Sequence, residues 1–286
     1  MTMFTISGEP KEAAKARRKV LEEFDDLEFI EEGHIYTLNG RNLSSASGIG
    51  RRFIREPFNE QKQAAIYAKR HGATAAYWIK EWQCKAFRAS TLGTKTHAFG
   101  ESLSYLRAGH PEFISDLIRN QYLPEHRYLA PIHAREDAVV HFLDELPSSY
   151  HLVLNEAKAY TGKNPVKELN PKEQICGTFD MLYYYDGDGD KSRSGYAIFD
   201  YKTNINLFSQ YNRRYGKMLA EPFSDFIEED FSLYAIQLSL YAMMIEDIGL
   251  PVIERKIVWL REDDRGEGIY EILDVPDLSQ RLRQVL

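Results

Sequence analysis

The feature that most constrains the fold of this 286-residue chain is a change of hydrophobic pattern near residue 150. Before that point apolar residues follow helical spacing, whereas after it they form short alternating or continuously apolar runs, as strands do. The pattern predicts strands over 151–160, 174–185, 195–203, 251–260 and 268–273, and one strong helix over 231–248. Strands interrupted by a helix, after a helical half, predict an α/β sheet with a helical elaboration.

The first half is expected to be mainly helical. We predict a helix over 9–26, a hairpin over 28–38, and helices to about residue 107 and again over 111–146. The hydroxyls of residues 44–47 are placed to cap a helix. These elements leave no obvious linker between the two halves.

The charge of the chain is unevenly distributed. The net charge is −7, which argues against a protein covered in positive charge, yet residues 41–107 carry twelve basic and only four acidic side chains. Aromatic residues are interleaved with these bases, a composition typical of grooves that bind single-stranded nucleic acid. The same composition also fits a solvated helical face with core aromatics behind it, and both interpretations stay open at this point.

Two exclusions follow from composition. The chain has two cysteines, Cys84 and Cys176, too few for a disulfide framework or for a four-cysteine zinc or iron–sulfur site. No apolar run approaches the roughly 20 residues needed to cross a bilayer. We therefore expect a protein of a reducing, cytoplasmic compartment that does not insert into a membrane.

Carboxylates mark the second and third predicted strands. Asp180 lies on the second, and Asp200 and Lys202 share one face of the third because alternate strand residues point the same way. Two carboxylates on adjacent strands suit a hard divalent cation such as Mg²⁺. A lysine beside them suits metal-assisted hydrolysis of a phosphodiester, although a simple ion pair at a strand end is the alternative.

A helix before the sheet adds two further candidates. His97 and Glu101 are four residues apart, so a helix presents them on one face. Packed across the sheet, such a helix can offer the His97 imidazole as one more ligand.

Four motifs now occur in a fixed order along the chain. They are Gly93-Thr94-Lys95-Thr96-His97-Ala98-Phe99-Gly100-Glu101, Gly177-Thr178-Phe179-Asp180, Asp200-Tyr201-Lys202-Thr203 and Gln237-Leu238-Ser239-Leu240-Tyr241. This series resembles the RecB-like branch of the PD-(D/E)XK nuclease superfamily. The stretches 34–36 and 43–47 are similar to phage exonucleases and to the mitochondrial genome maintenance exonuclease.

The resemblance implies a restriction-endonuclease-like fold, in which a central mixed β-sheet is flanked by helices. It implies Mg²⁺ or Mn²⁺ as the cofactor, with His97, Asp180, Asp200 and the Tyr201 carbonyl as metal ligands and Lys202 as the catalytic lysine. Gln237, Tyr241, Glu101, Thr203 and Glu156 are implied as substrate-binding or supporting residues. Members of this branch that hold an iron–sulfur cluster use four cysteines, so no such cluster is expected.

The expected function is that of a metal-dependent DNA exonuclease of recombination, repair or replication in a bacterial or phage-infected cell. Residues 1–92 are expected to form part of a DNA passage, and 93–286 the nuclease core. Single-stranded DNA is the expected partner, with a possible single-strand-binding or recombination protein beside it. A structure-specific or flap endonuclease and a non-catalytic DNA-binding recombination partner are the alternatives. Polarity, oligomeric state and the choice between DNA and RNA stay open.

Overall fold

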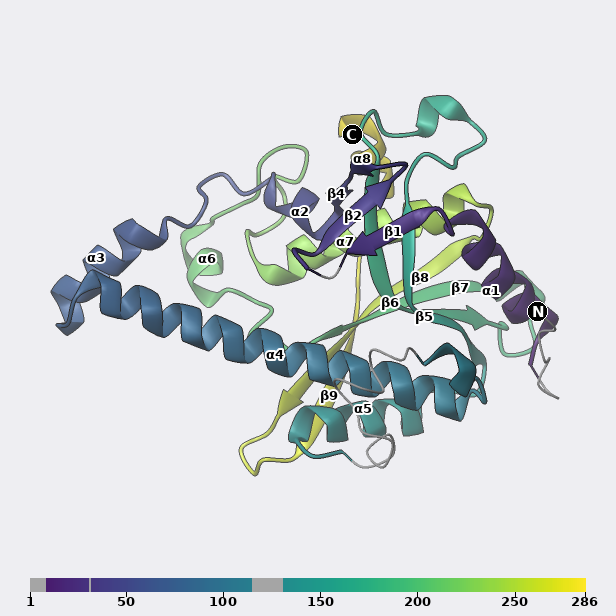
Figure 1. Ribbon diagram of the computed structural model, residues 1–286, viewed down its shortest axis with the longest axis horizontal. Helices are drawn as coiled ribbons and strands as arrows, with labels where there is room; N and C mark the ends of the chain where they lie inside the picture. Colours follow the sequence, from purple (N-terminus) through teal and green to yellow (C-terminus); the bar gives the residue numbers. More distant parts are fainter. Residues whose placement is uncertain (1–8, 31, 115–130) are drawn as a thin grey trace.

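The computed structural model of the protein describes residues 9–30, 32–114 and 131–286 (Figure 1). Among these residues, no helix is both long and apolar enough to cross a membrane.

A mixed sheet forms the centre of the described structure. Its six strands are β4 (Ser44–Ser45), β5 (Tyr150–Tyr160), β6 (Ile175–Tyr185), β7 (Gly195–Lys202), β8 (Val252–Glu262) and β9 (Gly268–Asp274). β7 and β8 run parallel, as do β4 and β6, whereas the other neighbours are antiparallel. The long strands and the helix α7 (Asp230–Asp247) agree with the predicted ranges to within two residues. The predicted α/β sheet flanked by helices is therefore confirmed.

One side of β6 pairs with two different strands and leaves a gap between them. β5 pairs with β6 along its length and so occupies one edge. On the other edge β4 pairs with residues 175–176 and β7 with residues 181–185. Residues 177–180 of β6 therefore have no strand partner on that side within the described structure, and this opening includes Asp180.

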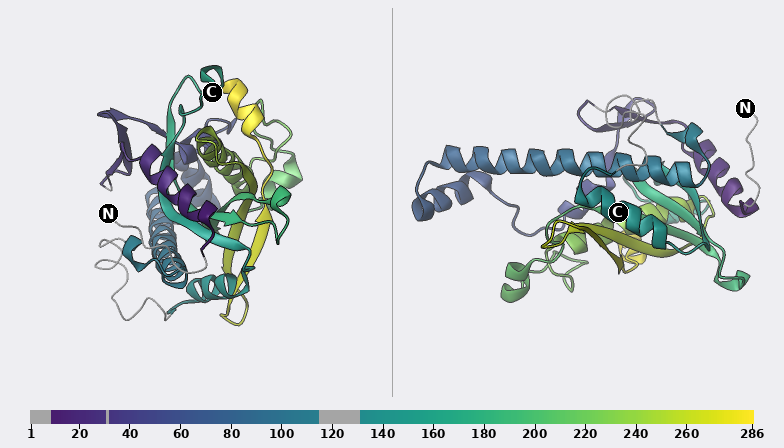
Figure 2. Two further views of the ribbon diagram at one scale, coloured as in Figure 1. Left: turned by 90° about the vertical axis from the view of Figure 1, so that its right-hand side faces the viewer. Right: turned by 90° about the horizontal axis from the view of Figure 1, so that it is seen from below.

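Helices cover both faces of the sheet (Figures 1 and 2). On one face α4 (Ala75–Arg107) and α5 (Ala134–Glu145) bury an apolar layer that includes Phe99, Phe142 and Phe199. On the other face α1 (Lys11–Glu23) and α7 bury a second layer. α7 is apolar on nearly all sides because α2 (Ala46–Arg51) and α8 (Ser279–Val285) cover the side that does not face the sheet.

The N-terminal elements pack into the same core as the second half of the chain. The predicted hairpin is present as β1 (Leu27–Ile30) and β2 (Ile35–Leu38), which form a small antiparallel sheet with β3 (Arg41–Asn42). The side chain of Ser45 accepts a hydrogen bond from the amide of Gly48 and caps α2, as predicted. Because α4 runs continuously through residues 92 and 93, the boundary drawn there from sequence falls inside a helix.

A helical arm projects from the body of the molecule (left in Figure 1). We define this arm as residues 58–91: α3 (Glu60–His71) packs antiparallel to the first turns of α4, and the rest of α4 returns to the sheet. Every side chain from 83 to 91 is exposed, and Gln83 and Ala86 line a space between α4 and α3.

Shorter elements complete the described chain. They are the 3₁₀ helices η1 (Pro111–Phe113), η4 (Lys167–Leu169) and η5 (Lys191–Arg193), and helix α6 (Gln210–Tyr215) between β7 and α7. Of the helical stretch expected over 111–146, the structure describes η1 and α5, while 115–130 lies outside the described residues.

Candidate metal centre

Two carboxylates face each other across β5 and β6. Asn155 pairs with Met181, so the next step of this antiparallel ladder puts Glu156 opposite Asp180. The backbone at Glu156 has φ of +46°, in the left-handed region that side chains other than glycine rarely adopt. At a candidate site, a strained backbone of this kind indicates that the fold holds the Glu156 side chain in one direction at a conformational cost.

A third carboxylate continues the row into β7. The β6–β7 ladder ends at Met181 opposite Phe199, so one further step puts Asp180 opposite Asp200. In place of that backbone pair, the amide of Tyr201 donates a hydrogen bond of 2.6 Å to Oδ2 of Asp180. The strands therefore separate at Asp180, and its carboxylate occupies the opening. We name Glu156, Asp180 and Asp200 the carboxylate row.

The alternation of β6 changes at the same place. Phe179 belongs to the apolar layer beneath α7 and Met181 to the layer beneath α4, although residues two apart in a regular strand share a face. The regular alternation of β6 is therefore interrupted at Asp180, between these two residues. At this point Asp180 contacts His97 of α4, whereas Asp200 pairs with Lys202.

α4 brings a histidine to the carboxylate row. Nδ1 of His97 lies 3.3 Å from Oδ2 of Asp180 and 3.7 Å from Oε1 of Glu156. Two glycines on the same helix face permit this close approach. A Cβ at Gly100 would lie 2.6 Å from the Tyr201 ring, and one at Gly93 would lie 3.2 Å from Oγ1 of Thr203.

Three of these side chains form a group that fits a metal ion. One ligand atom from each of His97, Glu156 and Asp180 lies within 4.8 Å of the others. Carboxylate oxygens suit Mg²⁺ and Mn²⁺, and an imidazole nitrogen favours Mn²⁺ over Mg²⁺. The donor set therefore fits the divalent cations expected from the sequence.

The electrostatics of the group are those of a site with excess negative charge. Burial opposes the imidazolium charge of His97, yet Asp180 and Glu156 outweigh it and raise the pKa of His97 to about 10. Burial raises the pKa of Glu156. Burial acts in the same sense on Asp180, but the charge of His97 outweighs it and lowers the pKa of that carboxyl. His97 thus serves as an internal counter-ion for its two carboxylate neighbours.

Lys202 forms an ion pair with Asp200. The two side chains are 12 % and 2 % exposed, so the pair is largely removed from water. Burial and then the charge of Asp180 raise the pKa of Asp200 to about 6. Burial opposes the ammonium of Lys202, but Asp200 and Asp180 outweigh it and raise the lysine pKa above its ordinary value. Lys202 is therefore a stable ammonium group.

Tyr234 of α7 holds Lys202 from the other side. The lysine Nζ lies 4.5 Å from the centre of the Tyr234 ring, within the range of a cation–π interaction. The Tyr234 hydroxyl donates to the side chain of Asn204, and Asn204 donates to Asp230. Sequence reasoning missed Tyr234. Its spacing of three residues from Gln237, on one helix face, is the signal that could have indicated it.

Glu101 lies near this group but outside the three-residue ligand set. It is 8 % exposed, and burial, followed by the charges of Glu156 and Asp180, raises its pKa to about 9. Its backbone carbonyl accepts a hydrogen bond from the side chain of Asn155.

The remaining sequence candidates support the sheet near its opening. Nε2 of Gln237 donates a 2.8 Å hydrogen bond to the hydroxyl of Tyr241. The Tyr241 ring packs on β6, where a Cβ at Gly177 would lie 2.7 Å from it. Tyr241 thus packs α7 against the unpaired part of β6, and Gln237 binds the hydroxyl of Tyr241.

Not every expected ligand belongs to the three-residue group. Among the described residues the group contains His97, Asp180 and Glu156, whereas Asp200 pairs with Lys202. Tyr201 contacts Asp180 through its amide. The roles of Asp200 and of the Tyr201 carbonyl in holding a metal stay predictions.

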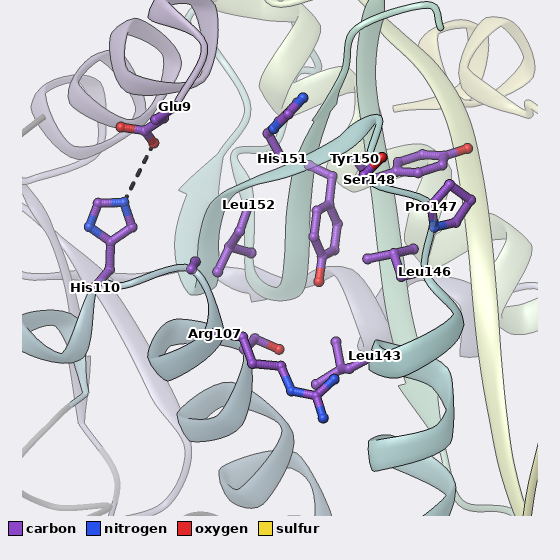
Figure 3. Close-up of a pocket in the computed structure, with 13 residues that line it drawn as sticks. Glu9, Arg107, His110, Leu143, Leu146, Pro147, Ser148, Tyr150, His151 and Leu152 are labelled. Atoms are coloured by element: carbon purple, nitrogen blue, oxygen red, sulfur yellow. Dashed lines mark ion pairs between the residues drawn. The ribbon is translucent and has the colours of Figure 1, made fainter. Parts of the chain in front are cut away.

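A pocket of about 440 Å³ lies elsewhere, at the ends of α4 and α5 and the start of β5 (Figure 3). Arg107, His151 and Tyr150 line it, and His110 lies 3.5 Å from Glu9 at its rim. None of the candidate residues lines this pocket. The chemistry of the carboxylate row, rather than the depth of a cavity, therefore marks the candidate site.

A scan against protein-family models matches none of them, and a search of curated proteins finds no similar sequence.

Proposed function

We propose that this protein is a divalent-metal-dependent DNA exonuclease of the RecB-like PD-(D/E)XK type, with a restriction-endonuclease-like core. The observation that carries the proposal is the clustering of His97, Glu156 and Asp180 within 4.8 Å, next to the Asp200–Lys202 ion pair. Asp180 and Asp200 are buried, and buried carboxylates this close together are costly without a cation, which argues against a protein that only binds DNA.

His97, Glu156 and Asp180 would hold the metal, with Asp200 beside them. A bound divalent cation would polarise the scissile phosphate and lower the pKa of a water molecule. His97 must give up its proton to act as a ligand, because only a neutral imidazole nitrogen binds a metal.

Lys202 has a separate role in this proposal. As an ammonium it donates hydrogen bonds, so it orients the attacking water or balances the charge that develops on the phosphate oxygens. Asp200 fixes the direction of the lysine, and Tyr234 limits its motion from the opposite side. Attack on phosphorus then displaces the 3′ oxygen and leaves a 5′ phosphate.

The charge distribution supports a polynucleotide substrate. The bases of residues 41–107 belong in part to the arm and to α4, which also carries His97. A strand bound along α4 can therefore run from the arm to the carboxylate row. Its affinity should fall with increasing salt because phosphate contacts release counter-ions.

The test is digestion of single-stranded DNA labelled at the 5′ or the 3′ end, as a linear oligonucleotide and as a circle, with Mg²⁺, Mn²⁺ or EDTA. The proposal predicts degradation of the linear strand with either metal and none in EDTA, while circles survive. Rapid cutting of circles would show an endonuclease, and no cutting with any metal would reject the enzyme proposal.

A further inference from the structure

The arm carries an open groove lined by aromatic rings. Phe58, Tyr67 and Trp82 line a space of about 470 Å³ between the start of α3 and α4, together with the amides of Gln63 and Gln83. The centre of the Trp82 ring lies 5.5 Å from that of Tyr67 and 6.0 Å from that of Phe58, both edge to face. Phe58 is 71 % exposed and Tyr67 41 % exposed, which is unusual for rings that could pack into a core.

The arm that carries this groove has more basic than acidic side chains, although Glu60 itself lines the groove. The arm contains six basic and two acidic residues. None of the basic side chains forms an ion pair with a carboxylate of the described residues. The bases are Lys62, Lys69, Arg70, Lys80, Lys85 and Arg88. A surface of this kind complements a polyanion.

The same helix joins the groove to the candidate metal centre. Trp82 and His97 both belong to α4, and fifteen residues of helix correspond to about 22 Å. The intervening side chains 83–91 are all exposed, so they leave the path along the helix open. A chain of a few nucleotides spans this distance.

We infer that the groove on the arm binds one unstacked base of a single-stranded DNA whose end lies at the carboxylate row. The aromatic rings provide stacking faces for the base, the two glutamine amides provide donors and acceptors for its edge, and the arm lysines and arginines contact the flanking phosphates. A base of duplex DNA is paired and stacked, so it cannot enter. This inference rests on the proposed function for its substrate and adds the subsite that holds it.

The decisive experiment compares two exposed phenylalanines on the arm. Phe58 lines the groove and is 71 % exposed, whereas Phe87 lies outside it and is 73 % exposed. The affinity of the full chain for a fluorescein-labelled 20-nucleotide single-stranded DNA is measured by anisotropy in EDTA, so that no cleavage occurs. We expect Phe58→Ala to weaken binding about tenfold and Phe87→Ala to weaken it by less than threefold. Circular dichroism and thermal melting of both variants check that the arm keeps its fold.

Several results would overturn the inference. One is an equal loss of affinity for single-stranded DNA in the two variants. Another is a loss in Phe58→Ala that is as large for blunt duplex DNA as for single-stranded DNA. A third is tighter binding of RNA of the same sequence than of the single-stranded DNA. Dissociation of an oligomer by Phe58→Ala, with DNA affinity unchanged, would instead assign the groove to a second copy of this chain.

Cleavage by the wild-type chain with Mn²⁺ is measured separately. Phe58-dependent binding without any cleavage would support the groove and reject the nuclease proposal. Cleavage by the wild-type chain, together with unchanged DNA binding by Phe58→Ala, would support the nuclease proposal and reject the groove as a DNA site.

Discussion

The amide of Tyr201 donates a 2.6 Å hydrogen bond to the carboxylate of Asp180, at the point where the ladder between β6 and β7 ends. This contact replaces a strand-to-strand backbone bond with one from backbone to side chain. It holds Asp180 in the opening of the sheet, between His97 of α4 and the Asp200–Lys202 pair. The β6–β7 ladder therefore ends at the same residue, Asp180, that begins the candidate metal centre.

Lys202 is predicted to act in cleavage rather than in folding alone. Lys202→Met should slow Mn²⁺-dependent cleavage of single-stranded DNA by about 100-fold or more, because it removes a donor aimed at developing charge. Lys256 on β8 is the matched control, since its side chain is 17 % exposed against 12 % for Lys202 and also pairs with an aspartate, Asp274. Equal rates for Lys202→Met and Lys256→Met, both folded at the assay temperature, would contradict the role of Lys202.

The Tyr234 ring is predicted to position Lys202 through its face, not its hydroxyl. Tyr234→Phe keeps the ring beneath the ammonium and loses only the hydrogen bond to Asn204, so its cleavage rate should stay within about twofold of wild type. Tyr234→Leu removes the ring and should lower the rate about tenfold, with the substrate KM changed less than kcat. Equal losses in the two variants would show that the hydroxyl network matters instead.

Metal binding is predicted to release protons. The pKa of His97 is raised to about 10 in the metal-free protein, so the imidazole is protonated throughout the range from about pH 6 to 9 and must lose its proton to bind a metal. The apparent Mn²⁺ affinity should therefore rise by about tenfold per pH unit in this range and level off above the pKa. Calorimetric titrations in two buffers of different ionisation enthalpy count the protons. The count should fall by about one in His97→Gln, and identical heats in both buffers would contradict the prediction.

The left-handed backbone at Glu156 predicts an unusual order of stabilities. Glycine adopts this conformation without strain, whereas alanine does not, so Glu156→Gly should unfold with a free energy about 1 kcal/mol higher than that of Glu156→Ala. Both variants lack the carboxylate and should lose Mn²⁺ affinity to the same extent. Chemical denaturation of the metal-free variants measures the difference. A Glu156→Ala variant as stable as Glu156→Gly would show that the strain is absent.

The strands and α7 could be predicted from sequence because their apolar runs are long and regular. The sequence also placed Asp180, Asp200, Lys202 and His97 in one neighbourhood, since motif order and strand alternation need no tertiary detail. The contact of Glu156 with His97 could not be predicted from sequence, because it depends on the left-handed backbone of Glu156 and on the position of α4 over the sheet.

The shape of the arm could not be predicted from the sequence either. The interleaved bases and aromatics allowed either a solvated helical face or a groove. The structure shows a groove between α3 and α4 with exposed rings, which only the packing of two helices produces. Tyr234 escaped notice because its partner Lys202 comes from a strand 32 positions earlier in the sequence.

The most direct test of the account is the rate of Mn²⁺-dependent cleavage of a 5′-labelled single-stranded oligonucleotide by wild type and by Asp180→Asn. This substitution keeps the size of the side chain and an oxygen able to accept the hydrogen bond from Tyr201, but it removes the charge that faces His97. The account predicts a loss of at least about 100-fold with binding in EDTA retained. Cleavage by Asp180→Asn at the wild-type rate would contradict it.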